Sequence, residues 1–119
     1  MTQSQKSKIM DKSKFFEGLD NDMDIVNAVV EAFIESHEQV LADINQAISE
    51  KNPKKLEHSA HTLKGSMKAL YANQGIIMTE KLEQMGRSHT LEGAKQIFSQ
   101  LQAYLPVLLE ELQQLEKAA

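Results

Sequence analysis

Apolar residues recur at three- and four-residue steps along most of the chain, which is the spacing of one face of an α-helix. This pattern predicts two long amphipathic helices, at residues 22–50 and at about 91–117. Two shorter segments, 53–72 and 76–87, have the same period, and a short helix at 13–18 precedes them all. No segment alternates apolar and polar residues as a half-buried strand does. The pattern therefore predicts an all-α protein.

Residues at the predicted helix ends support this division. Acidic residues from Asp20 to Asp24 favour a helix N-terminus, where they complement the helix dipole. Asn52 can cap the next helix, and Pro53 suits its first position because that N–H has no helical partner. Asn73, Gln74 and Gly75 separate the second and third long segments. Short connections of this kind predict an antiparallel, up-down four-helix bundle with a short additional N-terminal helix.

Length, composition and charge limit the possible functions. The 119 residues suit one domain, which we assign to 13–119, while the polar residues 1–12 are predicted to form a flexible tail. The chain has no cysteine, which excludes disulfides and thiolate metal sites. A net charge of -4 argues against nucleic acid as a partner, because such binders need a basic surface. With neither a signal peptide nor an apolar membrane span, we expect a cytoplasmic monomer with protein partners.

The most informative segment is Glu57 to Leu70, EHSAHTLKGSMKAL, which lies inside the second long helix. With about 100° per residue, its apolar residues fall roughly 100° to 180° from His61. The residues within about 60° of His61 are Glu57, His58, Lys64, Gly65, Lys68 and, just beyond this segment, Ala72. His61 is therefore predicted to lie at the centre of the exposed face.

The residue types around His61 suit a phosphoryl group. Lys64 and Lys68 place positive charge one and two turns along the same face, which favours a phosphoryl anion. Gly65 costs a helix interior roughly 1 kcal/mol relative to alanine, but it lets a bulky partner approach. A neutral imidazole offers a ring nitrogen as nucleophile. We interpret His61 as a candidate phosphoacceptor.

The run Ala60-His61-Thr62-Leu63-Lys64-Gly65-Ser66 resembles the core motif of a known family, the histidine-containing phosphotransfer (HPt) domains of bacterial multistep phosphorelays. The resemblance implies that His61 accepts the phosphoryl group, Lys64 steadies its oxygens and Gly65 makes room for the partner. The implied partners are response-regulator receiver domains or hybrid sensor histidine kinases. The protein would be a carrier without kinase activity or a cofactor of its own, and magnesium would belong to the receiver.

The resemblance also points to residues of secondary importance. Some relatives place a glutamine on the neighbouring helix within reach of the acceptor, and Glu83 is the matching candidate here, with Gln84 and Arg87 nearby. Beside His61, the secondary candidates are Glu57, His58 and Lys68. One departure is Tyr71, which stands where many members have glycine.

Two alternatives remain open from the sequence. The first is an HPt-like helical module that binds a partner without phosphotransfer. The second is a metal-binding bundle that uses His58, His61 and Glu57. Di-iron bundles carry Glu-x-x-His on two helices, and that motif does not occur in this chain.

Overall fold

The computed structural model describes the backbone of residues 9–118 and the side chains through residue 116. Within this part the chain forms five helices and no strand, so the all-α prediction is confirmed. The helices are α2 (Lys12–Gly18), α3 (Met23–Ser49), α4 (Pro53–Ala69), α5 (Asn73–Ser88) and α6 (Ala94–Ala118).

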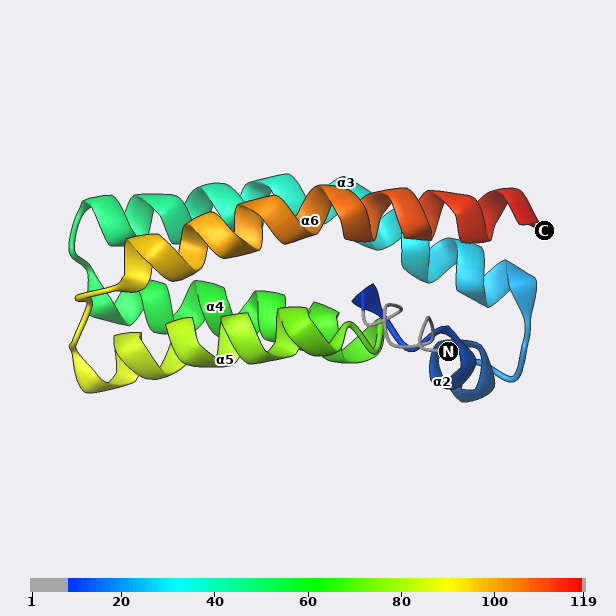
Figure 1. Cartoon of the computed structure of the whole chain (residues 1–119), viewed down its shortest axis with the longest axis horizontal. Coiled ribbons are helices and arrows are strands. Elements are labelled where there is room, and N and C mark those ends of the chain that lie inside the picture. Colours follow the sequence, from blue (N-terminus) through cyan, green and yellow to red (C-terminus); the bar gives the residue numbers. More distant parts are fainter. Residues whose placement is uncertain (1–8, 119) are drawn as a thin grey trace, which may run out of the picture.

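The four longer helices pack around one apolar core. The packed pairs are α3 with α4, α4 with α5, α5 with α6, and α3 with α6. Figure 1 shows α3 and α6 in one layer and α4 and α5 in the other, with successive helices running in opposite directions. Large side chains from all four helices are fully buried between them, among them Val26, Ile44, Leu56, Leu63, Met67, Leu82, Leu101, Leu105 and Leu108. Burial of these side chains supplies the main stabilising free energy of the fold.

The N-terminal segment covers the part of the long helices that α4 and α5 do not reach. α3 and α6 have 27 and 25 residues, whereas α4 and α5 have only 17 and 16. Met10 and Phe15 are 3% and 1% exposed. The hydroxyl of Tyr104 donates a hydrogen bond of 2.6 Å to the carbonyl oxygen of Ile9. The chain from Ile9 onward is therefore part of the packed domain (Figure 1).

Part of the predicted flexible tail is packed against the core. Residues 1–8 of the predicted tail lie outside the described residues, but residues 9–12 belong to the packed segment, so the tail prediction extends too far. The short N-terminal helix begins at Lys12 rather than at residue 13, because Asp11 is its N-cap: the Asp11 carboxylate accepts from the backbone N–H of Lys14 at 3.1 Å.

The other helix ends agree with the sequence in part. Asn52 caps α4 with Pro53 in the first turn, as predicted. Asp22, one of the acidic residues expected near the start of α3, is the N-cap of that helix. The predicted break at Asn73 to Gly75 is wrong, since these residues form the first turn of α5. The last helix begins at Ala94 instead of Leu91.

α4 ends at Ala69, three residues before the predicted Ala72, and the reason lies at Tyr71. Its φ of +55° is in the left-handed region, which costs a residue with a side chain roughly 1–2 kcal/mol. The N–H of Ala72 donates to the carbonyl of Met67 at 2.9 Å, and that of Tyr71 donates to Lys68 at 3.1 Å, which is a Schellman ending. Tyr71 thus adopts the left-handed conformation that glycine most often supplies at a helix C-terminus.

Two buried glycines let α5 approach α4 closely. An ideal Cβ built on Gly86 would lie 2.5 Å from the backbone nitrogen of Glu57 and 2.6 Å from the carbonyl oxygen of Pro53. Gly75, three turns earlier, would place its Cβ against the side chain of Met67. The atoms that face Gly86 are backbone atoms of α4, which cannot move aside as a side chain can. Any larger residue at position 86 must therefore push α4 and α5 apart.

In the described part of the chain, no helix combines the length and the apolar character needed to cross a bilayer.

Gly86 and Gly65 provide a matched test of this packing. We expect Gly86→Ala to lower the free energy of unfolding by about 1–3 kcal/mol, because its methyl group has no space. Gly65→Ala should raise it by about 0.5–1 kcal/mol, because nothing lies within 4 Å of a Cβ there and alanine favours a helix. Urea denaturation of both variants measures the difference. Equal stability of the two variants would contradict the close packing of α4 on α5.

Candidate functional site

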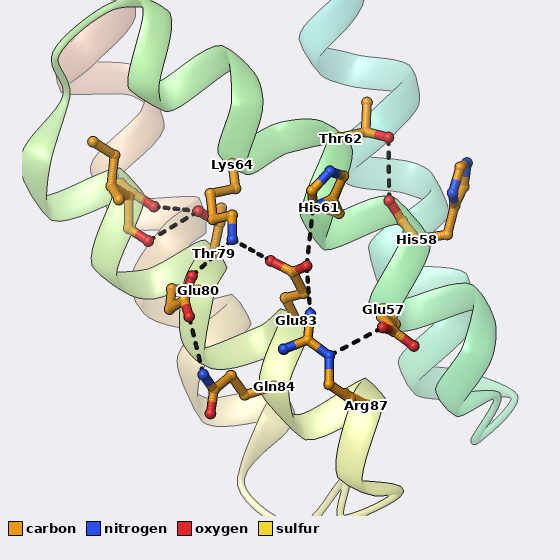
Figure 2. Close-up of polar contacts among 12 residues, drawn as sticks. Glu57, His58, His61, Thr62, Lys64, Thr79, Glu80, Glu83, Gln84 and Arg87 are labelled. Carbon is orange, nitrogen blue, oxygen red and sulfur yellow. Dashed lines mark hydrogen bonds and ion pairs between the residues drawn. The ribbon is translucent and has the colours of Figure 1, made fainter.

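The predicted acceptor, His61, projects from the outer surface of α4 toward solvent. Its side chain is 67% exposed, as the sequence predicts. Its Nδ1 lies 2.9 Å from Oε2 of Glu83 on α5 (Figure 2). An ionised carboxylate only accepts hydrogen bonds, so in the neutral imidazole Nδ1 carries the proton and Nε2 holds the free lone pair. This contact therefore selects the tautomer in which Nε2 is the nucleophilic nitrogen.

Glu83 is almost fully buried, with a side chain that is 4% exposed. Besides His61, it contacts Nη2 of Arg87, at 2.9 Å from Oε2, and Nζ of Lys64, at 2.6 Å from Oε1. The Lys64 contact is an ion pair, and within the described part of the chain Oε1 has no hydrogen-bond partner. Two cations therefore compensate the buried negative charge.

The charge state of Glu83 follows from these neighbours. Burial alone would raise the pKa of the Glu83 carboxyl. The contacts of Lys64 and His61 outweigh burial, and the net result is a pKa below the ordinary value. Glu83 is therefore an anion at neutral pH.

Lys64 does not extend into solvent as its position on the exposed face suggested. Its side chain leans toward α5 and is only 13% exposed. Nζ donates a hydrogen bond of 2.8 Å to Oε1 of Glu80 and forms the ion pair with Glu83. Glu80, followed by Glu83, raises the pKa of Lys64, so its ammonium group remains charged. The sequence analysis missed Glu80, although its spacing of three residues from Glu83 places both on one side of α5.

The secondary candidates divide into two groups. Arg87 belongs to the site, because its guanidinium connects Glu83 to Glu57, with 3.2 Å between Nε and Oε2 of Glu57. Gln84 contacts Glu80 rather than His61, at 3.0 Å. For His58 and Lys68 the described structure has no side-chain hydrogen bond or ion pair. We call the connected set the Glu83 cluster: Glu57, His61, Lys64, Glu80, Glu83 and Arg87.

Gly65 leaves the surface of α4 open one turn from His61. It is exposed, and a Cβ at this position would meet nothing within 4 Å. Because glycine has no side chain, a partner can approach the outer side of the His61 imidazole without a steric clash at residue 65. Within residues 9–118, no three His, Asp or Glu side chains form a group that could hold a metal ion.

Comparison with known proteins gives an independent indication of the family. The family model of the Hpt domain matches residues 28–118. Among solved structures, the chain is similar to the crystal structure of histidine-containing phosphotransfer protein B (HptB) from Pseudomonas aeruginosa PAO1. The TM-score is 0.86 and the sequence identity 18%, over 93% of this chain and 96% of that chain. At this identity the similarity shows the fold alone. No curated protein sequence matches the chain.

Proposed function

Because this chain belongs to the Hpt domain family, we propose that it carries phosphoryl groups between the proteins of a phosphorelay, with His61 as the acceptor. The observation that carries this assignment is the state of the His61 imidazole. The ring is exposed, Glu83 engages Nδ1, and Nε2 is left as the nucleophile. The antiparallel packing of α4 on α5 presents this ring to a partner.

The proposed donor is a phosphorylated aspartate in a receiver domain. Nε2 of His61 attacks phosphorus in line, so an N–P bond forms while the bond from phosphorus to the aspartyl oxygen breaks. The aspartate leaves as a carboxylate, and the same path run backward delivers the phosphoryl group to another receiver. Such a transfer needs positioning and charge stabilisation more than covalent assistance. The receiver supplies the magnesium ion, and this chain acts as a carrier without kinase activity.

Lys64 is suited to hold the transferred group. Its ammonium group has three N–H donors, and the carboxylates of Glu80 and Glu83 occupy at most two of them. One donor remains for a phosphoryl oxygen on His61, which lies three residues, or slightly less than one turn, before Lys64 along α4. In this proposal Lys64 neutralises phosphoryl charge while the two glutamates keep it in place.

The proposal is tested by phosphotransfer from receivers. We expect purified receiver domains of the host, phosphorylated with acetyl phosphate and magnesium, to transfer label to this protein. The variant His61→Gln should take up no label, whereas the control His58→Gln should be labelled like the parent, because His58 makes no contact in the Glu83 cluster. Label on His61→Gln, or none on the parent from any receiver, would favour a binding module without phosphotransfer.

A second test concerns the open surface at Gly65. We expect Gly65→Leu to slow transfer from a phosphorylated receiver by about 100-fold, because misplacement by about 1 Å can cost that much. Leucine is a good helix former, so the variant should fold. Phosphorylation of His61 by phosphoramidate, a small donor, should remain within a few-fold of the parent rate. Equal slowing with both donors would contradict the role of Gly65 in partner access.

A further inference from the structure

The contact between Glu83 and His61 has a consequence for the phosphorylated state, which rests on the proposed function. When neutral imidazole bonds phosphorus through Nε2, the ring keeps the proton on Nδ1 and becomes positively charged. That proton lies on the atom that is 2.9 Å from Oε2 of Glu83. A buried anion at this distance favours the cationic ring over its deprotonated form.

We propose that Glu83 is a positioning residue that holds the Nδ1 proton on phosphorylated His61 and so keeps the phosphoryl group ready to leave. With the proton in place, the N–P bond breaks to release neutral imidazole, and phosphorus passes to a carboxylate or to water. Without the proton, the same step must expel an imidazolate anion, which is a far poorer leaving group. Glu83 therefore makes the phosphorylated protein suited to rapid delivery rather than to storage.

No proton has to be exchanged with solvent in this scheme. In the forward step the lone pair of Nε2 forms the bond to phosphorus, and the electron pair of the broken O–P bond leaves with the aspartate. In the reverse step the N–P electron pair returns to Nε2. The Nδ1 proton stays between the ring and Glu83 throughout, so both directions use the same protonation state.

The charged groups around the ring explain why Glu83 decides its charge. From α4, Glu57, His58, Lys64 and Lys68 share the face of His61, and from α5, Glu80, Glu83 and Arg87 lie along the same side. In the described residues, no ion pair or hydrogen bond joins a charged side chain of α3 to these groups. Among the described residues, Glu83 is the one whose side chain forms a hydrogen bond or ion pair with the ring. If its charge were removed, Lys64 and Arg87 would remain as cations and would oppose a positive imidazole.

Glutamine is the informative substitution, because an amide can either donate to or accept from Nδ1. Glu83→Gln keeps the size of the side chain and the possibility of a hydrogen bond, but it no longer favours the protonated ring. Glu92→Gln is the matched control, since it removes the same charge at an exposed position in the connection between α5 and α6.

The test uses protein phosphorylated with phosphoramidate and needs no receiver. We follow the decay of phosphohistidine by ³¹P NMR from neutral to alkaline pH. We expect the pH at which the decay slows to be about one unit lower in Glu83→Gln than in the parent. At mildly alkaline pH, the phosphohistidine of this variant should therefore decay about tenfold more slowly than that of the parent. Glu92→Gln should match the parent. Identical pH profiles for parent and Glu83→Gln would overturn the proposal.

A second measurement needs only the parent protein and holds even if Glu83→Gln folds poorly. In ¹H–¹⁵N spectra of the phosphorylated parent at mildly alkaline pH, Nδ1 of His61 should carry a proton. An unprotonated Nδ1 there would overturn the proposal. Both measurements use a chemical donor, so their outcome is separate from that of receiver transfer, which tests the proposed function itself.

Discussion

The site depends on one buried carboxylate that must be compensated. Glu83 is 4% exposed, and removing a charge from water is costly unless partners replace the lost hydration. Lys64 and Arg87 provide two cations, and His61 provides a donor. This requirement fixes the positions of both residues that the proposed chemistry uses. The imidazole of His61 is held in one tautomer, and the ammonium group of Lys64 is held beside it.

The close packing of α4 on α5 makes this arrangement possible. Gly86 leaves no room for a side chain between the helix backbones, and it lies next to Arg87 and three residues after Glu83. A wider separation of the helices would move Glu83 away from His61, because the glutamate side chain is short. The close approach of α4 and α5 is therefore needed both for core packing and for the contact between Glu83 and His61. A substitution at Gly86 that destabilises the fold is expected to disturb this contact as well.

The periodicity of the chain was enough to predict the helices and the outward direction of His61. Glu83 was also predicted, because a resemblance pointed to its place on the neighbouring helix. Periodicity could not show the direction of Lys64, whose long side chain turns from an exposed backbone position to reach buried and half-buried carboxylates. The predicted break between helices at Gly75 was also wrong, because a single sequence does not distinguish a glycine needed for close packing from one needed for a turn.

In the proposed phosphotransfer, Glu83 fixes the tautomer of the His61 imidazole before any phosphoryl group arrives. The most direct measurement is the tautomer of the neutral, unphosphorylated His61 ring, read from long-range ¹H–¹⁵N correlations. We expect a proton on Nδ1 and a free lone pair on Nε2. A proton on Nε2, or the tautomer mixture of a free imidazole, would contradict it.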